Sequence, residues 1–396
     1  MQQNRLMPDS INGKDGVVMA YKPAFEQADA LHKPAPALKN RRQPLPQWRR
    51  MLKHSITTAE QLAHHFPVDC QALQPVIERY PLRINPYYLG LIKQPGDSIW
   101  KQVVPDEREL LDADGMEDPL AEDIYSPVPN ITHRYPDRVL FLVSNQCAVH
   151  CRFCTRKRKI GKQFAVTDKT ISEGIAYIRF HREVRDVLIS GGDPLLLEDD
   201  VLSDILASVR SIPHVEIIRI GSRVPCVLPQ RITGRLSKAL RKFHPLYINT
   251  HFNHPDEITP EVVKTCALLN DAAIPLGCQT VLLKGVNDDP VVMQELMQKL
   301  LAIRVKPYYL HQMDLARGTG HFRTSIAAGL RIIQSLCGHS SGMGVPQFVI
   351  DLPGGGGKVP LLPEYVTGMK NGRMLIKNFQ GKIFRYPLHA EDLEEF

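Results

Sequence analysis

Residues 138–154 read RVLFLVSNQCAVHCRFC, an apolar segment followed directly by three closely spaced cysteines. The apolar part is rich in aliphatic and aromatic side chains, which predicts a buried β-strand. Five further segments of this kind are DVLIS (186–190), VEIIRIG (215–221), LYINTHF (246–252), LGCQTVLL (276–283) and VKPYYLH (305–311). Helical patterns, such as VLSDILASVRSI and PEVVKTCALLNDA, lie between them. This alternation predicts βαβ units with a parallel sheet covered on both faces.

Six such units fit either an incomplete TIM-type barrel or an open doubly wound sheet, and the pattern alone does not choose between them. Residues 46–130 are predicted as an N-terminal helical region and residues 131–340 as the α/β part. In the C-terminal segment, residues 341–396, we expect another strand at PQFVID, a flexible loop at PGGGGK and a β-hairpin with a tight turn at Gln380-Gly381. Residues 1–45 contain prolines and little periodicity, which indicates a flexible or strap-like leader.

The composition describes an ordinary globular protein with a basic end. The chain has 396 residues, 43% of them apolar, and a formal net charge of +7. Residues 1–50 hold nine Lys/Arg against four Asp/Glu, so most of the excess charge belongs to the leader and not to a nucleic-acid surface. We find no apolar run long enough to span a bilayer and no apolar signal sequence. A cytoplasmic protein without a membrane or nucleic-acid partner is therefore expected.

Three of the eight cysteines form a C-x-x-x-C-x-x-C motif, made of Cys147, Cys151 and Cys154. A disulfide framework is not expected in a chain of this size without a signal peptide. A structural zinc ion usually takes four ligands in two separated pairs, which this motif does not supply. A 4Fe–4S cluster with three thiolates keeps one iron open for chemistry. The motif also follows the first strand of the series, where α/β active sites lie.

Two glycine-rich motifs follow. Ser190, Gly191, Gly192 and Asp193 end the second strand, where glycines let the backbone approach a ligand and an acid offsets a cation. The run DLPGGGGK, residues 351–358, is not a phosphate loop, because Leu occupies position 352 and Val follows the lysine. It is either a surface loop with a solvated lysine or the tether of a lysine that forms a Schiff base with pyridoxal phosphate.

The cysteine motif after the first strand resembles that of the radical S-adenosylmethionine (SAM) superfamily. In this order, the triad, SGGDP, RIGSR, NTHFNHP, PYYLHQMDL, HFRT and PGGGGK closely resemble the lysine 2,3-aminomutase family, from about residue 48 to about residue 386. The resemblance implies an α/β fold with a partial (β/α)6 barrel. It further implies SAM, a 4Fe–4S cluster on the three cysteines, and pyridoxal phosphate on Lys358. The implied reaction is a radical isomerisation that moves the α-amino group of L-lysine to its β-carbon.

The resemblance also assigns roles to further residues. In THRYPDR, Arg134, Tyr135 and Arg138 would hold the cofactor phosphate, a role suited to guanidinium groups. The glycine motif of the second strand would meet the methionyl ammonium of SAM. The strand-end residues that would contact SAM or pyridoxal phosphate are Asn249, His251 and Gln279.

The substrate follows from three charged positions that match the family. Arg156 would pair with the substrate carboxylate, and Asp314 and Asp351 would grip the ε-ammonium of lysine. Two carboxylates around one ammonium form a charge-assisted cage that rejects anionic side chains. The cage favours lysine, and the same chemistry on arginine or glutamate is the alternative. The glycine-rich lysine loop favours the stand-alone mutases over the branch that acts with elongation factor P.

The resemblance implies a one-electron donor such as a flavodoxin or ferredoxin, and a homo-oligomer, either dimer or tetramer. Some family members bind structural zinc through extra cysteines near the C-terminus. Here no cysteine follows Cys337, so we predict no structural zinc. An alternative from another class is a zinc-stabilised RNA-binding protein that uses the triad and the basic run RFCTRKRK.

Overall fold

The structure, a computed structural model, describes residues 45–159 and 166–389. The leader predicted over residues 1–45 lies outside the described residues, apart from its last position. In the described ranges, no helix is both long enough and apolar enough to cross a membrane.

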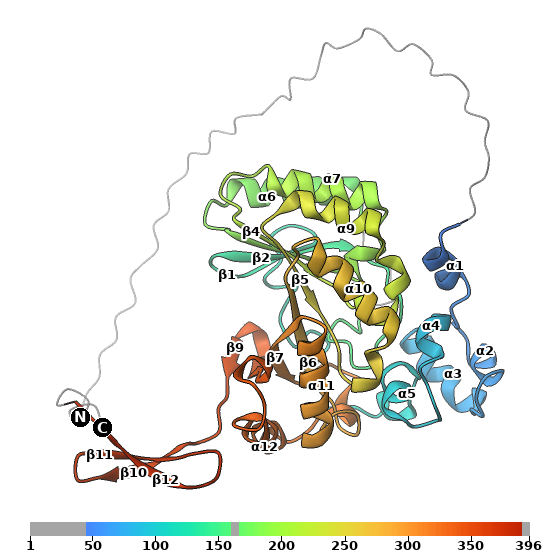
Figure 1. The fold of residues 1–396 in the computed structure, drawn as a ribbon. Coiled ribbons are helices and arrows are strands. Elements are labelled where there is room, and N and C mark those ends of the chain that lie inside the picture. The colour runs from blue at the N-terminus through green and yellow to red at the C-terminus, as the bar shows by residue number, and fades with distance from the viewer. Residues whose placement is uncertain (1–44, 160–165, 390–396) are drawn as a thin grey trace, which may run out of the picture. The chain divides into compact units, whose positions relative to one another are not determined.

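A nine-stranded sheet with strand order β1 to β9 forms the centre of the fold. Strands β2 to β8 pair in parallel, and β1 and β9 pair antiparallel at the two ends (Figure 1). The strands are β1 (Ile131–Tyr135), β2 (Arg138–Ser144), β3 (Asp186–Gly191), β4 (Ile217–Gly221), β5 (Leu246–Thr250), β6 (Leu276–Leu282), β7 (Val305–Gln312), β8 (Gln347–Leu352) and β9 (Gly357–Pro360). The sheet is barrel-like and nearly closed, which confirms the predicted barrel class.

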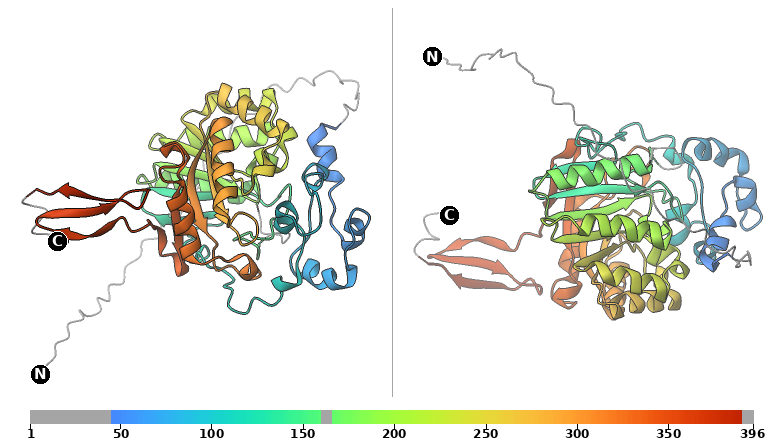
Figure 2. Two further views of the ribbon diagram at one scale, coloured as in Figure 1. Left: turned by 60° about the horizontal axis from the view of Figure 1, so that its bottom comes forward. Right: turned by 90° about the horizontal axis from the view of Figure 1, so that it is seen from above.

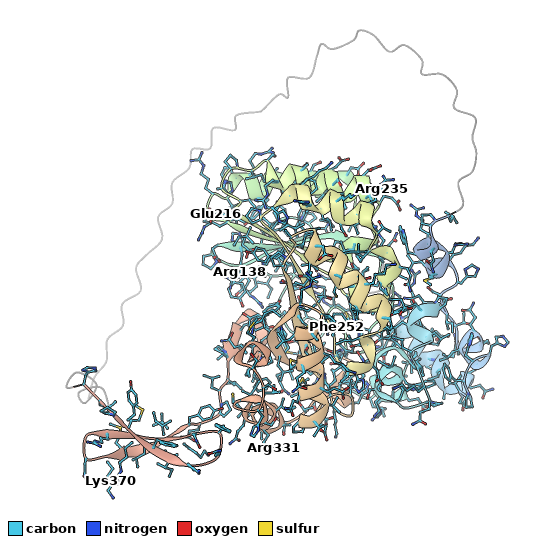
Figure 3. The ribbon with its side chains drawn as sticks, viewed as in Figure 1. Arg138, Glu216, Arg235, Phe252, Arg331 and Lys370 are labelled. Atoms are coloured by element: carbon cyan, nitrogen blue, oxygen red, sulfur yellow. The ribbon has the colours of Figure 1, made fainter. Side chains whose placement is uncertain are left out.

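Helices follow the parallel strands and cover the outer side of the sheet (Figures 1 and 2). They are α6 (Asp168–Phe180), α7 (Asp199–Arg210), α8 (Val224–Val227), α9 (Gly234–Leu240), α10 (Pro260–Asp271), α11 (Pro290–Ala302) and α12 (Ile326–Leu336). The core lies between these helices and the strands. Phe252, labelled in Figure 3, is fully buried there.

The predicted helical lead-in consists of short helices: α1 (Gln47–Lys53), α2 (Ala59–Ala63), α3 (Cys70–Arg79), α4 (Pro86–Leu89), α5 (Ser98–Val103) and the 3₁₀ turn η1 (Glu107–Glu109). Side-chain caps define their starts. For example, the carboxylate of Asp97 accepts the N–H groups of Ile99 and Trp100 at the start of α5. This cap fixes α5, whose Gln102 is fully buried.

The C-terminal segment corrects one expectation. The glycine run is not a flexible loop: Pro353–Gly355 form a 3₁₀ turn, and β9 then returns antiparallel to β8. Gly354, Gly355 and Gly357 have φ of 70°, 84° and 87°, a region that side chains rarely adopt. The four glycines therefore build a tight hairpin. The predicted strand at 346–351 is β8.

The predicted C-terminal hairpin is confirmed and forms part of a separate three-stranded sheet. Its strands are β10 (Val366–Lys370), β11 (Arg373–Lys377) and β12 (Ile383–Pro387). The loop between β11 and β12 contains Gly381 with φ of 77°, as the Gln380-Gly381 turn predicts.

Candidate active site

The cysteine loop begins at the carboxyl end of β2 and is held by the glycine pair at the end of β3. The N–H of Gly192 donates to the carbonyl of Ser144 at 2.7 Å. A side chain on Gly191, whose φ is +135°, would place its Cβ 2.1 Å from that carbonyl oxygen, and one on Gly192 would reach 2.3 Å from the carbonyl oxygen of Gln146. The predicted SAM motif therefore packs against the backbone just before Cys147, where only glycine fits.

The three thiols of the motif interact electrostatically with one another. Burial, together with Cys154 and Cys151, raises the pKa of Cys147, and burial with Cys151 raises the pKa of Cys154 to about 11. Thiolates gathered in this way repel each other and need metal cations to compensate, so the triad fits an iron–sulfur cluster. Across the described ranges, no three His, Cys, Asp or Glu side chains converge on a point that could hold one metal ion. A cluster has several irons, so its cysteine ligands need not meet at one point.

A buried ion cluster anchors the same loop to the helical lead-in. Glu109, at the end of η1, pairs with Arg152 through Oε1 at 2.8 Å and Oε2 at 2.5 Å, and with Lys157 at 2.6 Å. The Glu109 side chain is 0% exposed, that of Arg152 2% and that of Lys157 5%. Arg152 and Lys157 flank the last cysteine of the triad, so this cluster fixes both sides of Cys154.

Asp193 has all its carboxylate oxygens engaged within the chain. It accepts hydrogen bonds from Ser222 Oγ at 2.7 Å and from the N–H groups of Arg223, Val224 and Leu195. Burial raises the pKa of its carboxyl to about 6. The acid that the sequence assigned to the SAM motif therefore ties the end of β3 to the segment after β4. Ser190, on β3, is partly exposed.

The three predicted strand-end residues lie on β5 and β6 or next to them: Asn249 is near the carboxyl end of β5, His251 follows that strand, and Gln279 is in the middle of β6 and not at its end. Asn249 is in register with Gly221 of β4 and Gly277 of β6. Gln279 accepts a hydrogen bond from the hydroxyl of Tyr308 at 3.1 Å. His251 contacts Asn253 at 3.0 Å, and burial lowers the pKa of its imidazole to about 4. His251 is therefore neutral at neutral pH.

Lys358 and Asp351 are cross-strand partners in the β8–β9 hairpin. Lys358 Nζ lies 2.6 Å from Asp351 Oδ2, and Arg134 Nη2 lies 3.4 Å from the other carboxylate oxygen. The Asp351 side chain is only 3% exposed, whereas that of Lys358 is 29% exposed. His311 of β7 approaches the same carboxylate at 3.7 Å, and burial lowers its pKa to about 3. The candidate cofactor lysine and the candidate substrate acid thus share one site.

The THRYPDR segment lies directly against this hairpin. The hydroxyl of Tyr135 accepts the backbone N–H of Lys358 at 3.0 Å. The guanidinium of Arg138, at the start of β2 (Figure 3), stacks on the Tyr135 ring at 3.9 Å, and that of Arg134 lies 5.0 Å from the ring centre. Two guanidinium groups on one tyrosine beside Lys358 suit a phosphate dianion.

Arg156 is held by Glu122, a residue that the sequence reasoning missed. Glu122 bonds Arg156 Nε at 2.7 Å and Nη2 at 2.6 Å. Burial alone would raise the pKa of Glu122, but Arg156 lowers it below its ordinary value. Asp314 accepts the hydroxyl of Thr155 at 2.5 Å, and burial, with a contribution from Asp351, raises its pKa to about 6. The three predicted substrate residues therefore belong to one electrostatic network around Lys358.

Three functional candidates escaped the sequence reasoning: Glu122, His311 and Arg223. His311 and Arg223 lie in the motifs PYYLHQMDL and RIGSR, which marked the family without indicating a role. Glu122 lies in an acidic loop, where nothing in the sequence distinguishes it from its neighbours. Their roles depend on contacts between distant segments.

Comparisons with known proteins agree with this geometry. A family profile described as Radical SAM superfamily matches residues 141–296, and one described as Lysine-2,3-aminomutase matches residues 333–394. The L-lysine 2,3-aminomutase of Methanococcus maripaludis is 54% identical over 79% of this chain and 74% of that protein. That of Clostridium subterminale is 49% identical over 86% and 83%.

A glutamate 2,3-aminomutase of Clostridioides difficile is 46% identical over 76% of this chain and 72% of that protein. The identity and coverage of these relatives exceed what a shared fold alone explains. The chain belongs to the lysine 2,3-aminomutase family of the radical SAM superfamily.

Proposed function

We propose that this chain converts L-lysine to β-lysine by moving the α-amino group to the β-carbon. The observation that carries the proposal is the pair of carboxylates, Asp314 and Asp351, beside the amine of Lys358. A site that binds the side-chain ammonium of lysine needs such acids, whereas these acids would repel the side-chain carboxylate of glutamate.

Cys147, Cys151 and Cys154 are the proposed ligands of a 4Fe–4S cluster. Ser190, Gly191, Gly192, Asn249, His251 and Gln279 are the proposed contacts of SAM. The two glycines let the end of β3 pack against the backbone just before Cys147, and the buried imidazole of His251 is neutral, which supports a SAM site beside the cysteine loop. Asp193 is proposed with them, and its internal hydrogen bonds support a role in shaping this part of the site.

Lys358 is the proposed attachment site of pyridoxal phosphate, and Arg134, Tyr135 and Arg138 are the proposed phosphate contacts. The stacking of both guanidinium groups on Tyr135, whose hydroxyl bonds the Lys358 backbone, supports this assignment. When bound, SAM on the reduced cluster would be the source of a carbon radical, and pyridoxal phosphate would supply a conjugated ring system that delocalises the unpaired electron while the nitrogen migrates.

The residues of this chain bind and orient the substrate. Arg156 pairs with the substrate carboxylate. Glu122 engages its Nε–Nη2 edge, which leaves the other edge of the guanidinium for that carboxylate. Asp314 and Asp351 hold the ε-ammonium. Gripping both ends of the substrate fixes its β-carbon relative to the radical source and to Lys358.

We further propose a one-electron donor such as a flavodoxin or ferredoxin, and a cytoplasmic location, which suits the free cysteines of the described residues. A homo-oligomer is also proposed. It is supported by the apolar side chains that β12 exposes, such as Ile383, Phe384 and Tyr386. Sedimentation of the full chain tests this last point, and a monomer at micromolar concentration would contradict it.

The function is tested by anaerobic incubation of the iron–sulfide-reconstituted chain with dithionite, SAM and pyridoxal phosphate. L-lysine, L-arginine and L-glutamate are offered separately, and products are identified by mass spectrometry. We expect β-lysine from lysine only. A cluster-loaded enzyme that makes no β-lysine contradicts the proposal, and a β-amino product from arginine reassigns the substrate. A Cys151→Ser variant is the control for dependence on the cluster.

A further inference from the structure

A buried arginine contacts one of the three cysteines proposed to hold the cluster. Arg223 follows β4 in the RIGSR motif, and its Nη1 donates to the sulfur of Cys151 at 2.8 Å. The guanidinium also lies 5.0 Å from the ring centre of Phe153, two residues further along the same loop. The contact therefore joins the fourth strand of the sheet to the middle of the cysteine loop.

The charge of Arg223 is held in place from its other side. Its Nη2 donates to Glu257 at 2.7 Å, to Gln102 at 2.6 Å and to the hydroxyl of Tyr88 at 3.1 Å. The Arg223 side chain is 9% exposed and that of Glu257 0%. Such a pair is costly to bury, and it does not by itself account for the contact with the cysteine sulfur.

Glu257 is fixed in turn by the backbone. Its Oε2 accepts the N–H groups of Asn253 at 2.5 Å and His254 at 2.9 Å, and the hydroxyl of Tyr88 donates to its Oε1 at 2.6 Å. At the other end, the backbone N–H of Arg223 donates to Asp193. Both ends of the arginine are therefore anchored, and its cationic end points at Cys151 with the counter-charge on the far side.

We infer that Arg223 is a positioning residue that orients Cys151 for the iron–sulfur cluster and raises the reduction potential of that cluster. This inference rests on the proposed function, because it requires a cluster on the triad. Reduction adds one electron to the cluster. A cation and an N–H···S hydrogen bond stabilise the reduced state more than the oxidised one. Glu257 is farther from the sulfur than Arg223, so it offsets this effect only in part.

The inference predicts opposite shifts for two variants. Glu257→Gln removes the counter-charge and leaves the arginine, so the potential should rise. The double variant Arg223→Gln with Glu257→Gln removes both charges and the hydrogen bond to sulfur, so the potential should fall below that of the unmodified chain. We expect at least a tenfold change in the equilibrium constant of reduction for the double variant, or about 59 mV for one electron.

The measurement is an anaerobic redox titration of the reconstituted full chain, followed by the EPR signal of the reduced cluster. Asp256→Asn is the matched control, because it removes a charge one position away that pairs with the exposed Lys93. It should leave the potential unchanged. Suppose that both Glu257 variants keep an iron content near that of the unmodified chain and show an unchanged reduction potential. That result would overturn the inference and leave Arg223 a structural residue.

A second measurement starts from the unmodified chain, so it does not depend on the folding of the Glu257 variants. Pulsed EPR of the reduced cluster, in a chain labelled with ¹⁵N in its arginine side chains, should show a nitrogen coupling that disappears in Arg223→Lys. If the labelled chain shows no such coupling, Arg223 does not form the N–H···S hydrogen bond with Cys151, and the inference is wrong. An unmodified chain that takes up no cluster would instead overturn the proposed function, and this inference as its consequence.

Discussion

Lys358 and Asp351 face each other across the β8–β9 hairpin, with Nζ of the lysine 2.6 Å from Oδ2 of the aspartate. The chain's own ammonium thus lies where the proposed substrate ammonium would meet Asp351. Once the lysine amine is engaged elsewhere, the carboxylate becomes available to a second cation. One acid can therefore serve two amines in succession.

Replacing Asp351 by Asn should weaken lysine binding more than cofactor loading. The substitution keeps the size of the side chain and removes the charge-assisted hydrogen bond, which is worth about 1.5–3 kcal/mol. We expect the KM for lysine to rise roughly 10- to 100-fold. Cofactor loading, read from its absorbance, should change little. Glu364→Gln, an exposed acid beyond β9, is the control. Equal damage to KM and to loading would show a structural acid instead.

Replacing Lys358 by Ala should abolish covalent attachment of pyridoxal phosphate. The expected result is loss of the absorbance band of the lysine-bound cofactor, checked by borohydride reduction and peptide mass mapping. Lys370→Ala, a lysine at the end of β10 that Figure 3 labels, is a control that should retain the band. A band that persists in Lys358→Ala would assign the cofactor to another lysine.

Replacing Glu122 by Gln should release Arg156 from its fixed orientation. The bidentate contact at Nε and Nη2 is weakened, while the size of the side chain at position 122 is kept. We expect the KM for lysine to rise about tenfold, with a smaller change in kcat. Asp123→Asn is the matched control, because Asp123 is the neighbouring acid and its side chain is 60% exposed. If both variants behave alike, the loss of acidic charge explains the effect and the orientation of Arg156 does not.

Replacing Glu109 by Gln should destabilise the fold and loosen the cysteine loop. The substitution leaves Arg152 and Lys157 buried without a counter-charge, which typically costs about 3–5 kcal/mol. Urea unfolding of the cluster-free chain measures the loss, and iron content after reconstitution measures the loop. Glu107→Gln, in the same 3₁₀ turn but exposed, should change neither. If the unfolding midpoint of Glu109→Gln is unchanged, the side chains of Arg152 and Lys157 become hydrated in the variant and do not remain buried.

The carboxyl of Asp314 should make the free energy of unfolding depend on pH in the acidic range. Burial raises its pKa to about 6 in the folded chain, above the value of 3.8 expected when unfolded. The folded state therefore binds more protons between pH 4 and 6, so this group's contribution to stability is present below pH 4 and lost as pH rises through 6. Asp193 titrates in the same window, so the comparison is between the unmodified chain and Asp314→Asn. The free energy of unfolding of the variant should depend less steeply on pH. If the unmodified chain and the variant give identical curves, the pKa of Asp314 is not raised in the folded chain.

The sequence predicted the parallel strands because each is a short apolar run separated from the next by a helical pattern. It also predicted that polar residues after these strands lie near one another, since the carboxyl ends of parallel strands meet at one edge. Strand β1, with Arg134 and Tyr135, was not predicted as part of the sheet. Its pairing with β2 is antiparallel and depends on a tight turn instead of on periodicity.

The glycine run was the one wrong structural expectation. Composition indicated a flexible loop, whereas positive φ at three glycines and cross-strand pairing make a hairpin. The sequence also did not predict the partners of Arg156 and Arg223, because Glu122 and Glu257 come close to these arginines only in the folded chain. A buried counter-charge leaves no local pattern.

The contact between Tyr135 and the backbone of Lys358 has a consequence for biosynthesis. Tyr135 belongs to the first strand of the sheet and Lys358 to the last, so every intervening strand is made before they can meet. During synthesis, Cys147, Cys151 and Cys154 emerge about 200 residues before Lys358. The contact between Tyr135 and Lys358 can therefore form only after all nine strands of the sheet have been synthesised.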